Sequence, residues 1–190
     1  MKDIFDLEPR TGIPKDSSYI KSYPSLLRYF EGKSTLGSED VICGAHMVYG
    51  WMPTILNVDF KQKDLDPDGA TVLLMKARDE GQLSDGNITL LAKLINHSFV
   101  GASKLLHFVA PESFAIWDSK VYTFVHEQPT YHYRVNNIKN YRDYLNKLKL
   151  LNADSRFERF HDSVNVKIGY PVSALRAIEL VMFLNAPILA

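Results

Sequence analysis

The 190-residue sequence is poor in cysteine, in net charge and in long apolar runs. Its single cysteine, Cys43, excludes an internal disulfide and a zinc site made of cysteines, which favours a reducing, cytoplasmic setting. The 22 basic and 22 acidic residues give a formal net charge of zero, which argues against a strongly basic nucleic-acid coat but allows a local basic face. No stretch approaches the roughly 18–20 apolar residues of a membrane-spanning helix, and the first residues lack the apolar core of a signal peptide, so we expect no membrane partner.

Alternating polar and apolar residues, which predict β-strands, are also scarce. Apolar residues make up 46 % of the chain and charged residues 23 %, a balance typical of a folded globular domain. Apolar residues recur instead at helical spacing between short polar breaks. We therefore predict an all-α fold, a multi-helix globule with a helix-hairpin-helix-like element. The expected helices cover about 17–30, 38–51, 69–80, 87–96, 102–109, 120–126, 137–151, 154–162 and 173–184.

Two prolines and the chain length bear on this assignment. Pro24 lies inside the first helix, so that helix starts either at Ser17 or Ser18, or near Tyr23. Pro53 is expected to end the second helix. The length fits a single all-α domain over 1–190, or the same domain divided into two helical subdomains with a site between them. The apolar last helix fits either a core or an interface, so the oligomeric state stays open.

A lysine and an aspartate within about 87–126 are the strongest candidates for chemistry. Residues 97–101 indicate a tight turn that contains Gly101, followed by a helix that carries Lys104 near its start. Asp118 precedes the next helix as a predicted N-cap. The positive end of a helix dipole disfavours the ammonium form of a nearby lysine. Because a neutral amine is a nucleophile and a carboxylate stabilises a developing cation, the pair predicts attack on an electron-poor sugar carbon.

This order of helix, turn with Gly101, helix with Lys104 and then Asp118 resembles the helix-hairpin-helix DNA glycosylases, and more narrowly the 8-oxoguanine DNA glycosylase-like proteins. Residues 100–104 and 116–121 carry the resemblance, which covers about 91–125. The sequence departs from the family pattern in two respects. Ala102 and Ser103 fill the hairpin where a second glycine is usual, and the interval between the lysine and the aspartate is shorter than in the well-known members.

The resemblance implies a DNA glycosylase that removes an oxidised purine, with a further strand-cleaving lyase step. The damaged nucleotide would rotate out of the duplex into a pocket. Lys104 would attack the sugar C1′, displace the base and leave a Schiff base, while Asp118 would stabilise the positive charge on the sugar. DNA is the expected partner, and neither a cofactor nor a metal is expected. The residues expected to contact DNA are Gly101, Ser103, Ser119, Lys120 and His107.

Each candidate also has a purely structural explanation. A lysine early in an amphipathic helix is often a solvated end residue, and an aspartate before a helix often only caps it. The six histidines show no spacing typical of a zinc site, and His97 and His107 fit a core or surface position as well as a phosphate contact. Trp51 and Trp117 fit the core as well as stacking on an extruded base.

The charge distribution and the absence of a second hairpin glycine leave two other functions open. Between 131 and 176, nine basic residues stand against four acidic ones, which fits either a DNA-facing surface or a solvated helix face with ion pairs. The first alternative is a non-catalytic nucleic-acid-binding or phage-defence accessory protein with a glycosylase-like fold. The second is an N-glycosidase that acts on a free nucleoside or an RNA base, which the zero net charge favours.

Overall fold

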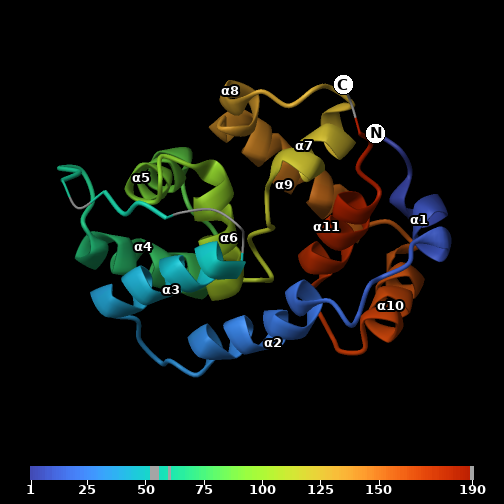
Figure 1. Ribbon diagram of the computed structural model, residues 1–190, viewed down its shortest axis with the longest axis horizontal. Helices are drawn as coiled ribbons and strands as arrows, with labels where there is room; N and C mark the ends of the chain where they lie inside the picture. Colours follow the sequence, from blue (N-terminus) through green and yellow to red (C-terminus); the bar gives the residue numbers. More distant parts are fainter. Residues whose placement is uncertain (52–55, 60, 189–190) are drawn as a thin grey trace.

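The computed structural model describes residues 1–51, 56–59 and 61–188, and regular structure within these ranges is helical (Figure 1). An isolated bridge pairs Val58 with Ile95. The predicted all-α class is therefore confirmed. The elements are α1 (Ile4–Leu7), the 3-10 turn η1 (Glu8–Arg10), α2 (Ser18–Glu31), α3 (Ser38–Trp51), α4 (Pro67–Glu80), α5 (Asp85–Leu94), α6 (Phe99–Val109), α7 (Ser119–His126), α8 (His132–Val135), α9 (Ile138–Asn152), α10 (Phe157–Ile168) and α11 (Ala174–Leu184).

The helices form two groups, each arranged around one buried helix. In the first group α2, α3, α4 and α5 pack against α6, and in the second α1, α7, α9 and α10 pack against α11. Figure 1 shows the first group at the left and bottom and the second on the right, with α5 in contact with α9. Buried apolar residues from Ile4 to Met182 form one continuous core across both groups. Helix α11 belongs to this core, because all residues from Leu175 to Met182 are buried.

Side-chain caps start most of the longer helices where the sequence indicates a start. In each case a short polar side chain accepts a hydrogen bond from a backbone N–H in the first turn, which would otherwise have no helical partner. The capping residues are Ser17, Asp66, Ser84, Ser98, Asp118, Asn137 and Ser173. Gly81 and Gly169 end α4 and α10 in the left-handed conformation, where glycine carries no steric penalty.

Pro24 lies inside α2 without ending it. The proline ring removes the N–H that would bond to the carbonyl four residues earlier, which is that of Ile20. The Tyr170 hydroxyl donates a 2.7 Å hydrogen bond to this carbonyl and replaces the missing donor. The helix therefore runs from Ser18, and the alternative start near Tyr23 is wrong.

Other helix limits differ from the sequence-based prediction in small ways. The last helix before α11 covers Phe157–Ile168 rather than 154–162, and the short helix α8 was not predicted. Pro53, the expected stop signal of α3, lies outside the described residues. These differences leave the order of the major helices unchanged.

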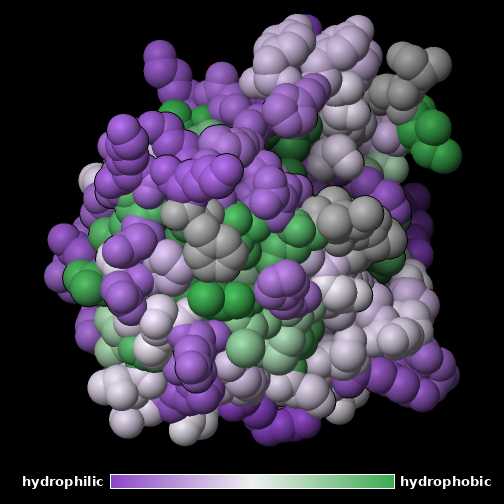
Figure 2. Space-filling view, turned by 60° about the vertical axis from the view of Figure 1, so that its left-hand side comes forward, coloured by the Kyte–Doolittle hydropathy of each residue, from purple (hydrophilic) through white to green (hydrophobic). Residues whose placement is uncertain are grey.

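Turned so that the α3–α5 side comes forward, the molecule shows a largely hydrophilic surface with hydrophobic side chains near the middle of the visible face (Figure 2). Within the ranges that the structure describes, no helix has both the length and the apolar character needed to cross a bilayer.

Candidate active site

The turn between α5 and α6 forms a tight hairpin over residues 95–98. Asn96 and His97 both take left-handed backbone conformations, with φ of 60° and 49°. Asn136 holds the hairpin from the other helix group, since its Nδ2 donates to the His97 carbonyl at 2.7 Å and its Oδ1 accepts from the Phe99 N–H at 2.8 Å. The predicted turn over 97–101 thus ends earlier than expected, at the N-cap Ser98.

Gly101 consequently lies in the first turn of α6 and not in the hairpin. Its N–H donates to the Ser98 hydroxyl at 3.3 Å. A Cβ atom at this position would lie 2.2 Å from the Tyr49 hydroxyl oxygen, so the glycine lets α3 and α6 approach closely. Gly101 is buried, and this geometry gives it a packing role in place of the predicted contact with a DNA phosphate.

Lys104 lies one turn further along α6 and is only 6 % exposed. Burial lowers the pKa of its amine below the usual range, while the negative charges of Asp118 and Glu179 oppose this shift and Arg176 adds to it. Its Nζ lies 6.0 Å from the centre of a Trp51 ring. The explanation of Lys104 as a solvated helix-end residue is therefore wrong.

Asp118 caps α7, with its Oδ1 accepting from the Val121 N–H at 2.9 Å. The segment that leads to it, residues 114–117, is held on both sides by side chains. Tyr141 and Tyr144 of α9 donate to the carbonyls of residues 115 and 116, at 3.2 and 3.1 Å. From α6, the Ser103 hydroxyl accepts from the Trp117 N–H at 3.1 Å. Because α6 also carries Lys104, this clamp fixes Asp118 relative to the lysine.

Ser103 and His107 do not face solvent, in contrast to their predicted DNA-contacting role. Both are fully buried. Ser103 holds Trp117, and the His107 ring lies within hydrogen-bond distance of the Phe114 carbonyl (2.8 Å) and the Tyr23 hydroxyl (2.8 Å). Burial lowers the pKa of His107 to about 3, so its ring stays neutral at physiological pH.

Lys104 and Asp118 line one cavity of about 600 Å³. One wall is aromatic: Tyr19 stacks between Trp51, at a ring distance of 4.0 Å, and Phe183, at 5.9 Å. Trp51 therefore lies at the cavity, whereas Trp117 is a core residue. Ser119 and Lys120, two of the predicted DNA contacts, are exposed at the same cavity, which also meets Val100, Thr130, Tyr131, His132 and Val135.

A buried ion pair lies behind the aromatic wall and was missed in the sequence. Arg176 and Glu179, three residues apart on α11, are both inaccessible to solvent and bonded to each other. The Arg176 guanidinium lies 5.2 Å from the ring of Tyr19 and 4.8 Å from that of Tyr23. Burial raises the pKa of Glu179 to about 7 against the opposing effect of Arg176. Two opposite charges at helical spacing in an otherwise apolar helix were the available signal.

The basic excess between residues 131 and 176 is partly neutralised within the molecule. Four of its nine cations form ion pairs with acids: Arg142 with Asp85, Arg156 with Asp3 and Asp154, Lys167 with Glu8, and Arg176 with Glu179. Several of these acids lie outside the 131–176 segment. The local excess thus serves in part to join distant segments.

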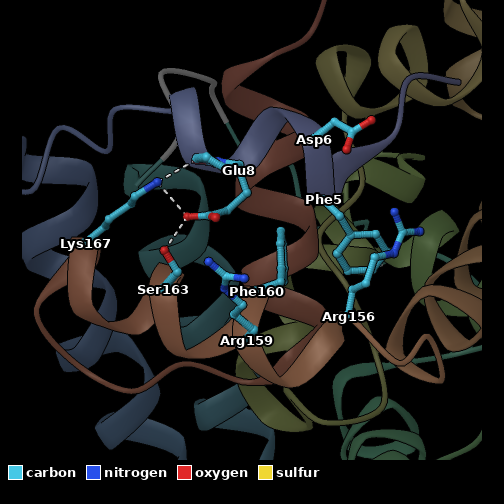
Figure 3. Close-up of a pocket in the computed structure, with 9 residues that line it drawn as sticks. Phe5, Asp6, Glu8, Arg156, Arg159, Phe160, Ser163 and Lys167 are labelled. Atoms are coloured by element: carbon cyan, nitrogen blue, oxygen red, sulfur yellow. Dashed lines mark hydrogen bonds and ion pairs between the residues drawn. The ribbon is translucent and has the colours of Figure 1, made fainter.

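A second cavity, of about 490 Å³, lies where α1 and η1 meet α10 (Figure 3). It also holds a lysine and a carboxylate, but here they bind each other directly. Glu8 Oε1 accepts from Lys167 Nζ at 2.6 Å and from the Ser163 hydroxyl at 2.7 Å. Lys167 also donates to the Glu8 carbonyl at 2.6 Å, and Arg156 lies over the Phe5 ring. These bonds fasten the N-terminal segment to α10.

Comparison with protein-family models, with curated proteins and with solved structures gives no match for this chain. Among the residues that the structure describes, no group of three or more His, Cys, Asp or Glu side chains is placed to hold a metal ion. The Lys104 cavity is therefore the feature from which we infer a function.

Proposed function

We propose that this protein is a lysine-dependent N-glycosylase that acts on a nucleobase extruded from DNA, with an associated strand-cleaving lyase step. The observation that carries the proposal is the shared cavity: Lys104 is buried, its pKa is lowered, and it faces the same hollow as Asp118. A lowered pKa increases the neutral fraction of the amine, which is the nucleophilic form.

In the proposed reaction, the Lys104 amine forms a bond to the sugar C1′ as the bond between C1′ and the base nitrogen breaks. The base leaves with the bonding electron pair and takes up a proton. Asp118 stabilises the positive charge that develops on the sugar and accepts the proton that the amine loses. Opening of the sugar ring gives a Schiff base. Loss of a C2′ proton then breaks the C3′–oxygen bond and cleaves the strand.

The aromatic wall supports a planar ligand in this cavity. Tyr19, Trp51 and Phe183 line the cavity with nearly parallel rings, at interplanar angles of 15° and 11° to Tyr19. Because Tyr19 is stacked between the other two, a base meets the outside of this group of rings. Aromatic rings stack on any nucleobase, because each base has a π-face. A flipped base that stacks here lies beside the Lys104 amine, which is near the Trp51 ring.

The test is reductive trapping. Duplex DNA that carries 8-oxoguanine, or an abasic site, is incubated with the protein and treated with borohydride, which reduces a Schiff base to a stable adduct. We expect an adduct with the native protein, none with Lys104→Gln, and an undiminished adduct with the matched control Lys167→Gln. An adduct that survives Lys104→Gln, or no adduct with the native protein on either DNA, contradicts the proposal.

A second candidate is an N-glycosidase that acts on a free nucleoside or an RNA base. The internal neutralisation of Arg142, Arg156 and Lys167 favours it, because these side chains are already paired with carboxylates and contribute less to binding a DNA backbone. In that case the protein releases base from a nucleoside or an RNA oligonucleotide while duplex DNA stays intact.

A further inference from the structure

Two tyrosines beside the Lys104 cavity are exposed, whereas the other phenylalanine, tyrosine and tryptophan residues in the described ranges are buried or half-buried. Tyr131 is 52 % and Tyr133 65 % accessible to solvent. Their rings are stacked, with centres 5.8 Å apart and planes inclined by 7°. The Arg134 guanidinium lies 5.0 Å from the first ring centre and 5.7 Å from the second. We call these three residues the tyrosine platform.

The backbone under the platform is firmly held, so the exposure of the rings does not arise from a loose segment. The indole of buried Trp117 donates to the Val135 carbonyl at 2.9 Å. Asn140 donates to the Arg134 carbonyl at 2.8 Å. Asn136, which follows Val135 in the chain, forms the two hydrogen bonds that hold the α5–α6 hairpin. The platform is therefore tied to both helix groups.

The platform lies at the edge of the proposed active site. Tyr131 lines the same cavity as Lys104, Asp118 and Lys120. A nucleotide that enters this cavity leaves its neighbours in the strand outside, unpaired or unstacked. Exposed aromatic rings with adjacent cations are the features by which proteins hold single-stranded nucleic acid, since the rings stack on bases and the cations meet phosphates.

From this arrangement we infer that Tyr131, Tyr133 and Arg134 form a binding site for an unpaired nucleobase next to the extruded one. The inference rests on the proposed nucleic-acid substrate and extends it: the preferred ligand is a strand with unpaired bases, and a fully paired duplex binds more weakly. Tyrosine and arginine also anchor protein partners. The position of Tyr131 on the wall of the Lys104 cavity favours the nucleic acid.

The experiment measures binding of a fluorescently labelled single-stranded oligothymidylate, and of a duplex of equal length, by anisotropy at low and high salt. We expect Tyr131→Ala with Tyr133→Ala to weaken single-strand binding by about tenfold or more, and to affect the duplex less. Phenylalanine at both positions preserves stacking and is expected to preserve binding. The matched control removes two exposed apolar side chains from other helices, Leu150→Ala with Val166→Ala, and is expected to leave binding unchanged.

The outcomes separate this inference from the proposed reaction. Weakened single-strand binding by the alanine variant supports the platform. If no borohydride adduct forms in the same set of experiments, the platform still stands and the proposed reaction fails. Equal binding by the native and alanine proteins overturns the platform even where the adduct forms, and so does an absence of single-strand binding by the native protein. The thermal unfolding of the alanine variant checks that it folds.

Discussion

The molecule contains two lysine–carboxylate pairs, Lys167 with Glu8 and Lys104 with Asp118, which differ in which partner is buried. In the pair that fastens α10, the carboxylate of Glu8 is buried, and the Lys167 side chain, 28 % exposed, bonds to it directly. In the candidate active site Lys104 is the buried partner, while Asp118 caps a helix at the rim of a cavity. Burial of the amine lowers its pKa, which increases the neutral fraction, the form of a lysine that can act as a nucleophile.

The segments that present the two acids differ as well. Glu8 belongs to a 3-10 turn, and its carboxylate and carbonyl form the bonds that join this turn to Lys167 and Ser163 of α10. Asp118 follows the segment 114–117, which Ser103, Tyr141 and Tyr144 hold independently of Lys104. Removing one charge of the Lys167–Glu8 pair should thus loosen the attachment of the N-terminal segment. Removing the charge of Asp118 should change only the proposed chemistry.

The largest effect is expected from Asp118→Asn. Asparagine caps helices about as well as aspartate, so stability should change little, while loss of the negative charge is expected to slow adduct formation by about 10²–10³-fold. Asp118→Ala removes both functions and should also lower the free energy of unfolding by about 1 kcal/mol. Trapping kinetics and urea unfolding are the measurements. Equal trapping rates for the native protein and Asp118→Asn show that Asp118 is a cap alone.

Arg176→Met should lower the free energy of unfolding by about 3–5 kcal/mol, because it leaves the Glu179 carboxylate buried without its cation. The double variant Arg176→Met with Glu179→Leu removes both charges and is expected to recover most of this loss. Urea unfolding of both variants measures the difference. A single variant as stable as the native protein indicates that Glu179 is already neutral in the fold.

The pH dependence should separate Lys104 from an ordinary lysine. Its pKa lies below the usual 10.5, so the trapping rate on abasic DNA is expected to rise by about tenfold per pH unit up to a midpoint below 10.5. The same shift makes the unfolded state bind more protons between the two pKa values, so stability rises with pH in that window. Lys104→Met should flatten this rise. A rate midpoint at or above 10.5 contradicts the burial argument.

Gly101→Ala is expected to cost about 1–3 kcal/mol, because the new Cβ meets the Tyr49 ring and forces α3 and α6 apart. Gly50 is a matched control, since it lies in the neighbouring α3 with open space where its Cβ would be. Gly50→Ala should therefore be neutral or stabilising by a few tenths to about 1 kcal/mol. Comparable unfolding free energies for the two variants rule out the packing role of Gly101.

The smallest effect concerns the ion pair between Lys167 and Glu8. Lys167→Met leaves Glu8 with Ser163 as its remaining side-chain donor and should lower stability by about 1–2 kcal/mol, with no change in the trapping rate. Lys21→Met breaks the exposed pair with Asp16 and should cost less than about 0.5 kcal/mol. Equal losses of unfolding free energy in the two variants show that the burial of Glu8 does not strengthen its ion pair.

Local sequence signals predict most of the fold but only part of the site. The periodicity and the caps Ser17 and Asp118 place helices within a few residues, because a cap acts on its own first turn. The hairpin was misplaced because Asn96 and His97 take left-handed conformations that are usual for glycine. Lys104 and Asp118 line one cavity, whereas their catalytic roles stay a prediction.

What sequence reasoning missed depends on contacts between distant segments. Gly101 is fixed by Tyr49, and Ser103 by the backbone of Trp117. His107 is buried by Tyr23 of another helix. None of these partners lies within the same helix, so helical spacing gives no sign of them. The pair Arg176–Glu179 was the exception, since its spacing was visible in the sequence.

The bond between Tyr170 and the Ile20 carbonyl sets an order on the completion of the fold. While the chain is being synthesised, the Ile20 carbonyl in α2 lacks its hydrogen-bond donor until residue 170 has been added. The same stretch contributes Tyr19, which needs α11 to supply Arg176 and Phe183 around it. The aromatic wall is thus assembled only when α11 packs beside Tyr19, and a nascent chain that stops before α11 carries no finished site.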